Sequence, residues 1–121
     1  MTGAQLYQRL LNNIATVGNR VYTSTAQQGA QTPYAVLKLV SDVKDYTHNG
    51  ASGLKTDRYQ VSIFGESLTT ARTAIEEATT TLEAYKTNGV SSIFRVNRIE
   101  VYEVDTNLYH VAADFIIRHK E

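Results

Sequence analysis

Apolar residues near the N-terminus recur with the spacing of one helix face. From Leu6 to Val17 the large apolar positions are separated by four, four and three residues. This spacing places them on one side of an amphipathic helix. Gly18 and Asn19 follow and predict its end.

A second segment has the same periodicity over a longer distance. Between Leu68 and Tyr85 the apolar positions are separated by three, four, three, four and three residues. Ser67 stands directly before the first of them, where a hydroxyl can cap the helix. Asn88 and Gly89 predict the end of the helix, because both tolerate the left-handed conformation of a C-terminal cap.

Other segments show the period of two that is typical of strands. The alternation is clean over Arg58–Phe64, where Tyr59 and its i+2 neighbours are apolar and the intervening residues are polar. Asp105–Asn107 is a short turn that joins the last two strands as a hairpin. The other predicted strands cover Arg20–Tyr22, Tyr34–Val43, Ile93–Val104 and Leu108–His119.

The order of these elements predicts the fold class. Runs of strands joined by turns, with one strand–helix–strand connection, predict an α+β domain built on a mainly antiparallel sheet of four to five strands. We expect two helices packed on one face of the sheet and the other face exposed. With 121 residues, 42% of them hydrophobic, residues 1–121 should form a single domain.

Charge and cysteine content exclude several classes of function. Lys and Arg total 12, as do Asp and Glu, so no net charge attracts the chain to nucleic acid or to an anionic membrane. The sequence has no Cys, which excludes a disulfide, a thiolate zinc site and a cysteine nucleophile. No stretch resembles a signal peptide or a membrane span, so we expect a soluble protein with no membrane partner.

No group of residues predicts catalysis, a cofactor or a metal site. His110 and Asp114 share one face of the last strand about 13 Å apart, and His119 lies on the other face, so we expect solvent-facing or hairpin-paired polar residues. Glu76 points away from its neighbour and should pair with Arg72 at i,i+4. Nucleotide and hydrolase motifs are absent from the sequence. We therefore predict that the protein is not an enzyme.

Arg95 and Arg98 raise one alternative. They alternate with Phe94 and Val96 in a predicted strand, an arrangement found in sheets that bind RNA. A single such strand in a neutral chain is a weak signal, and we expect no specific nucleic-acid partner.

Two segments are candidate subunit interfaces. Lys44–Gly53 is polar and Gly-containing, so we expect a loop or a mobile hairpin tip whose Tyr46, Thr47, His48 and Asn49 could order against a neighbouring subunit. The chain also has fifteen Thr residues. Several lie on the outer face of the second helix although Thr is a poorer helix former than Ala. Compositional drift explains this equally well, but such a face can pack against another subunit, with Thr73, Thr80 and Thr81 as the candidates.

Several motifs together resemble a known family. The motifs are Arg20-Val21-Tyr22, Pro33–Val36, Arg58–Phe64 followed by an Ala-rich helix, and Tyr102–Val111 ending in Asp114-Phe115. Their order and spacing are similar to those in the tail completion, or tail terminator, proteins of long-tailed bacteriophages. The resemblance spans nearly the whole chain. Asn107 stands where the family pattern has Gly, and Asn also tolerates left-handed geometry.

This resemblance implies a structural function in the virion. It implies an α+β subunit that forms a ring, commonly of about six copies, at the head-proximal end of the tail tube. The ring would end tail growth and join the tail to the head, with the tail tube protein and a head connector or stopper protein as partners, after assembly in the host cytoplasm. No catalytic residue and no cofactor comes with the family. The alternatives are a head-side connector or adaptor, or a tail tube subunit, of the same particle.

Overall fold

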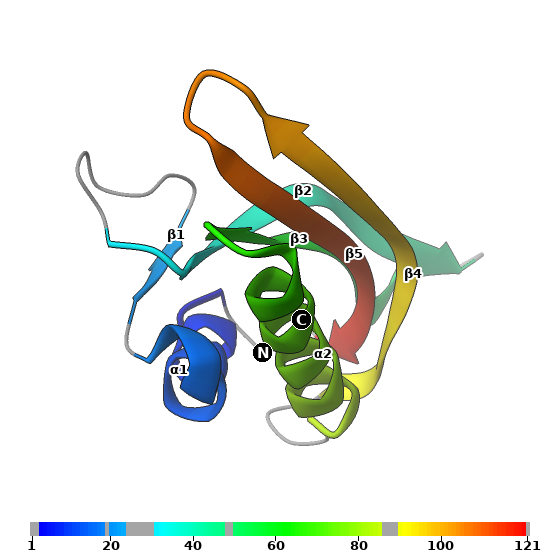
Figure 1. The fold of residues 1–121 in the computed structure, drawn as a ribbon. Coiled ribbons are helices and arrows are strands. Elements are labelled where there is room, and N and C mark those ends of the chain that lie inside the picture. Colours follow the sequence, from blue (N-terminus) through cyan, green and yellow to red (C-terminus); the bar gives the residue numbers. More distant parts are fainter. Residues whose placement is uncertain (1–2, 19, 24–30, 48–49, 86–89, 121) are drawn as a thin grey trace.

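A computed structural model describes residues 3–18, 20–23, 31–47, 50–85 and 90–120 (Figure 1). Two α-helices, a short 3-10 helix and five strands follow one another along the chain. In order they are α1 (Gly3–Asn13), η1 (Ala15–Val17), β1 (Val21–Thr23), β2 (Tyr34–Thr47), β3 (Gly50–Gly65), α2 (Leu68–Glu83), β4 (Val90–Glu103) and β5 (Leu108–Lys120).

The five strands form one sheet in the order β1-β2-β3-β5-β4. β1 pairs with β2 in parallel, and the other three pairings are antiparallel. The expected α+β fold with a mainly antiparallel sheet is therefore confirmed. In the β4–β5 turn, Asn107 has a φ of 55°, the left-handed conformation that Asn adopts more readily than most residues.

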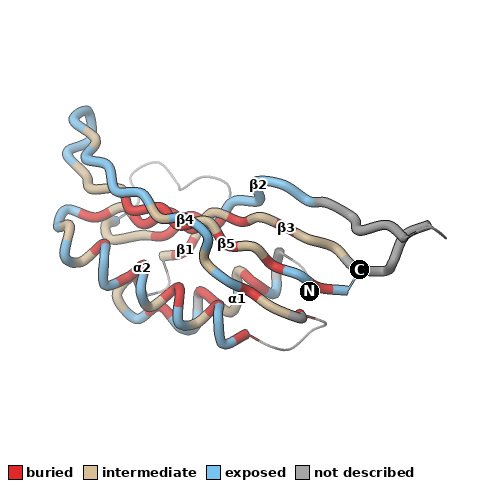
Figure 2. Tube along the Cα trace, turned by 90° about the vertical axis from the view of Figure 1, so that its right-hand side faces the viewer, coloured by how far each residue is buried: buried red, intermediate tan, exposed pale blue. Residues whose placement is uncertain are grey.

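Both helices cover the same face of the sheet (Figures 1 and 2). The two predicted apolar stripes are buried there, from Leu6 to Val17 and from Ala71 to Tyr85. The first stripe is not one continuous helix as predicted, because α1 ends at Asn13, Ile14 is extended and Val17 lies in η1. Both stripes pack against alternate residues of the central strands, among them Val61 and Phe115, which are fully buried. The hydrophobic effect of this burial, roughly 25 cal/mol per Å² of apolar surface, is what holds helices and sheet together.

The ends of α2 agree with the sequence at one terminus only. Ser67 is the N-cap, and its hydroxyl accepts a hydrogen bond from the amide of Thr70 at 3.5 Å. The predicted stop at residues 88–89 lies outside the described residues. The helix ends earlier, at Glu83, with Ala84 as C-cap.

Of the two expectations for Lys44–Gly53, the loop is wrong, whereas the hairpin is confirmed. β2 continues to Thr47 and β3 begins at Gly50, and Thr47 pairs with Gly50 across the hairpin. β5 pairs with β3 only from Leu54 onward, so residues 45–47 and 50–53 form a two-stranded arm beyond the end of β5. Glycine and polar residues indicated a loop locally, but a ladder between two strands needs only backbone groups.

Candidate assembly surfaces

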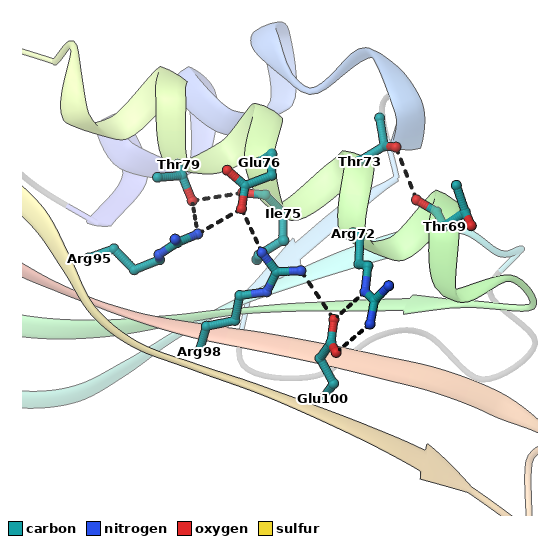
Figure 3. A network of polar contacts seen from close by, with 9 residues as sticks. All are labelled: Thr69, Arg72, Thr73, Ile75, Glu76, Thr79, Arg95, Arg98 and Glu100. Atoms are coloured by element: carbon teal, nitrogen blue, oxygen red, sulfur yellow. Dashed lines mark hydrogen bonds and ion pairs between the residues drawn. The ribbon is translucent and has the colours of Figure 1, made fainter.

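A network of ion pairs links α2 to the edge strand β4 (Figure 3). Arg72 contacts both carboxylate oxygens of Glu100, at 2.6 and 2.9 Å. Glu76 accepts hydrogen bonds from Arg95 and Arg98, at 2.9 and 2.6 Å. Arg98 also reaches Glu100 at 3.1 Å, so the five side chains form one connected group that holds β4 against the helix.

This network corrects the prediction that Arg72 pairs with Glu76 along the helix. A β-bulge between Arg95 and Asn97 brings Arg95 and Arg98 to the same face of β4, although alternation would place residues three apart on opposite faces. Their guanidinium groups then meet Glu76 from the sheet side. Because both arginines are occupied by carboxylates, the alternative of an RNA-binding strand loses its main support.

The network fixes the charge state of Glu100. Hydrogen bonds from Arg72, supported by Arg98, lower the pKa of Glu100 to about 2. The Glu100 carboxylate is therefore ionised at neutral and mildly acidic pH.

Four aromatic rings form a row across the sheet face that the helices leave uncovered. Tyr22 meets Tyr34 edge-on at 6.0 Å, and Tyr34 stacks on Phe64 at 5.1 Å between ring centroids. Phe64 stacks on His110 at 4.3 Å. The four rings come from β1, β2, β3 and β5, so the row ties four strands together.

His110 is hairpin-paired, as expected, whereas Asp114 pairs with residues of its other neighbouring strand, β3. His110 lies 3.4 Å from Glu103 in the hairpin partner strand. Burial lowers the pKa of His110 from 6.5, against the opposing effect of Glu103. Asp114 accepts hydrogen bonds from Arg58 at 2.6 Å and from Gln60 at 3.2 Å. These contacts lie on the uncovered face and link β5 to both of its neighbouring strands.

His119 is buried, so the expectation of a solvent-facing or hairpin-paired residue is wrong for it. His119 and Asp57 are 3% and 5% exposed, and Nε2 of His119 lies 2.7 Å from Oδ2 of Asp57. The ring donates from Nδ1 to the carbonyl oxygen of Lys120 at 2.9 Å. His119 has the same strand parity as Phe115, and this was the sequence signal for its inward direction.

Three of the Thr residues of α2 line a shallow hollow on the outer side of the helix pair. The hollow has a volume of about 600 Å³ and is lined by Asn13, Arg72, Thr73, Glu76, Glu77, Thr80 and Thr81. Thr73 donates a hydrogen bond to the carbonyl oxygen of Thr69 at 3.0 Å. The three Thr residues proposed as interface residues thus share one concave surface.

The other candidates lie in or next to the arm. Tyr46 and Thr47 belong to β2 and pair with Ala51 and Gly50. Residues His48 and Asn49 lie outside the described residues, as do the side chains of Tyr46 and Thr47. The structure therefore brings Thr73, Thr80 and Thr81 together and leaves the arm as a separate candidate surface.

Exposed apolar side chains are the feature that the sequence analysis missed. Eight large hydrophobic residues in the described part of the chain are between 42% and 75% exposed. They are Leu39, Val40, Phe94, Val96, Ile99, Val101, Tyr102 and Val104. The sequence showed them as ordinary strand residues, because only the strand order reveals which strands lie at an edge of the sheet.

Within the described residues, no three His, Asp or Glu side chains form a group that could hold a metal ion. None of the helices described here has the length and apolar character of a membrane span.

Comparison with known proteins identifies relatives by sequence and by fold. The family described as "Tail completion protein gp17" matches residues 4–120. A chain of the solved structure titled "Virion of native gene transfer agent (GTA) particle" superposes with a TM-score of 0.74 at 18% sequence identity. The alignment covers 96% of this chain and 92% of that chain, and at this identity it shows a shared fold. Comparison with curated protein sequences finds no significant match.

Proposed function

Because the chain belongs to the family of tail completion proteins described as gp17, we propose that it ends the growth of a phage tail tube and joins the tail to the head. As a member of this family it is a structural protein of the phage tail and a component of the virion. The proposed active form is a closed ring, commonly of about six copies, at the head-proximal end of the tube.

The observation that carries this proposal is the extent of the family match. Residues 4–120 include all five strands and α2 and nearly all of α1, so the match covers the whole domain rather than one motif. The proposed role needs no reaction. The ionised Glu100 network and the paired Asp114 are structural, and we propose that the protein is not an enzyme.

The proposed ring has three kinds of partner. Copies of the same chain contact each other around the ring, the tail tube protein meets one side, and a head connector or stopper protein meets the other. The Thr-lined hollow of α2, with Thr73, Thr80 and Thr81, and the β2–β3 arm, with Tyr46, Thr47, His48 and Asn49, are the proposed contact surfaces. Thr is short and β-branched, so it loses little side-chain entropy when a partner covers it.

The test is deletion of the gene from the genome that encodes it, followed by electron microscopy of the particles. The proposal expects tails of uncontrolled length and heads without tails, both reversed when the protein is supplied from a plasmid. Normal tail length with unjoined heads would favour a head-side connector, and complete absence of tubes would favour a tube subunit.

A further inference from the structure

The exposed large hydrophobic residues are not scattered over the surface. Six of the eight in the described residues lie in β4 or in the turn that follows it, from Phe94 to Val104, and the other two are Leu39 and Val40 in β2. β4 is one edge of the sheet, and β2 lies next to the other edge. Single exposed apolar residues need no explanation, but such a concentration along strand edges indicates contact with a partner.

β4 is a long strand with one free side. It has 14 residues and pairs only with β5 among the described strands. After the bulge at Val96 its ladder with β5 is regular from Asn97 to Glu103. Alternate residues of this stretch direct their backbone N–H and C=O groups away from β5, toward the free side.

β2 is free over most of its length on the side away from β3. β1 pairs with Ala35, Val36 and Leu37 only, and no described strand covers the outer side of β2 from Lys38 to Thr47. Leu39 and Val40 are exposed directly beyond the point where β1 ends. Among the described strands, two edges are therefore unpaired, at opposite sides of one sheet.

We propose that β4 of one copy pairs with the free edge of β2, Lys38–Thr47, in the next copy, so that the sheet continues from subunit to subunit. This rests on the proposed ring. Three successive antiparallel pairings make β4 run opposite to β2 within a copy. A rotation axis close to the strand direction preserves these directions, so β4 and the neighbouring β2 meet antiparallel.

A contact between the two different edges closes both of them. A β4–β4 pair across a two-fold axis would join two copies but leave the β2 edge of each copy uncovered. The β4–β2 contact, repeated around a rotation axis, leaves neither described edge unpaired, and it is the head-to-tail arrangement that a ring requires.

Cysteine crosslinking tests this contact directly, because the chain has no Cys of its own. Ile99→Cys and Ser41→Cys, which lie on the same face of the sheet, are made in separate chains, mixed, and treated with a short bis-maleimide, both as concentrated protein and in assembled particles. The proposal expects mixed dimers to exceed dimers of either variant alone by about tenfold, with Val104→Cys in place of Ile99→Cys as the matched control. Equal yields for all pairs, or no crosslink in either preparation, would overturn it.

Lysine substitutions test the direction of the contact. Ile99→Lys with Val101→Lys blocks the β4 edge, and Leu39→Lys with Val40→Lys blocks the β2 edge, while Val104→Lys adds a charge outside the strands. Because a charge blunts a strand edge, each double variant alone should associate at least about tenfold more weakly than Val104→Lys, and the two mixed should form one-to-one dimers. Self-association of the β2-edge variant at wild-type strength would overturn the proposal.

These outcomes are separate from those of the proposed function. Edge variants that associate normally would refute the edge contact even if gene deletion gives overlong tails. Conversely, β4–β2 crosslinks between copies would stand even if gene deletion leaves tail length unchanged.

Discussion

Arg72 of α2 donates two hydrogen bonds to Glu100 of β4, from Nε to Oε2 at 2.6 Å and from a terminal nitrogen to Oε1 at 2.9 Å. This fork geometry is specific to Arg with a carboxylate. It joins an edge strand to the helix layer at a point where both side chains are partly exposed. The pair therefore positions β4 more than it stabilises the domain.

Glu100 should make the domain sensitive to acid. The pKa of Glu100 is lowered from 4.5 to about 2, first by the hydrogen bond from Arg72. A carboxylate with a lowered pKa in the folded state stabilises the fold above pH 4.5, and this contribution is lost as the pH falls toward 2. Thermal unfolding should show a smaller decrease between pH 4.5 and 2 for Glu100→Gln than for wild type. Asp105→Asn, in the exposed turn, is the control, and an equal effect of both variants would contradict the assignment.

The buried pair of Asp57 and His119 should respond differently to single and double substitution. Asp57→Leu or His119→Leu alone leaves one polar group buried without its partner, and we expect a loss of about 3–5 kcal/mol in the free energy of unfolding. The double Leu variant should recover most of that loss, because two apolar side chains replace the pair. Equilibrium urea unfolding measures all three, and additive losses would refute the coupling.

The helices were the most predictable part of the fold, for a physical reason. A stripe such as Ala71 to Leu82 has to be buried to be stable, so its period reports both the helix and its inward face. Charge pairing could not be predicted in the same way. Arg72 has Glu76 within reach along the helix, but it pairs with Glu100, which comes close only after the sheet has formed. The bulge at Val96 that redirects Arg95 has no distinct sequence signal.

The arm shows how local sequence signals fail in a hairpin. Gly50 and Gly53 have low strand propensity, yet the ladder that begins upstream continues to Thr47 and Gly50. The prediction for His119 failed for the opposite reason. A polar residue near the end of a strand is usually exposed, but His119 is buried because Asp57, far away in the sequence, provides its partner. Sequence alone also could not show that β4 is an edge strand.

His110 should destabilise the domain in mild acid. Burial lowers the pKa of His110 below 6.5, so the unfolded chain binds a proton more readily than the folded one. The stabilising contribution is therefore complete above pH 6.5 and is lost as the pH falls through the lowered folded value. His110→Phe keeps a ring stacked on Phe64 and removes the titrating group. Chemical unfolding at pH 7.5 and pH 5 should show a smaller difference for this variant than for wild type; an unchanged difference would exclude His110 as the cause.

Two substitutions of Thr80 in the Thr-lined hollow should distinguish an effect on helix stability from an effect on assembly. Thr80 is exposed, and Thr80→Ala should stabilise the isolated subunit by a few tenths of a kcal/mol through helix propensity. Thr80→Arg should leave the unfolding temperature nearly unchanged but fill the hollow next to Thr81. If this surface contacts a partner in the virion, only the Arg variant should reduce complementation of a gene deletion. Equal complementation by both variants would remove the hollow from the proposed contact surfaces.

The arm can be shortened without touching the rest of the sheet. Tyr46 and Thr47 pair with Ala51 and Gly50, and β5 begins its ladder with β3 at Leu54. Replacing Asp45–Ser52 by Asn-Gly should therefore leave the core and cooperative unfolding intact, with a small change in unfolding temperature. A two-stranded ribbon is marginal by itself, so its amides should exchange faster than those of the central β3 segment around Val61.

The same deletion removes Tyr46, Thr47, His48 and Asn49 and the end of the free β2 edge. We expect weaker association of purified subunits and fewer joined particles in complementation. A variant that keeps the arm length but replaces residues 48–49 by Gly-Gly is the control, since it retains the strand edge and removes the tip side chains. If the deletion variant loses function and the Gly-Gly control does not, the backbone edge of the arm makes the contact. If both variants lose function, the side chains at the tip make it. Normal assembly of the deletion variant would exclude the arm from any subunit contact.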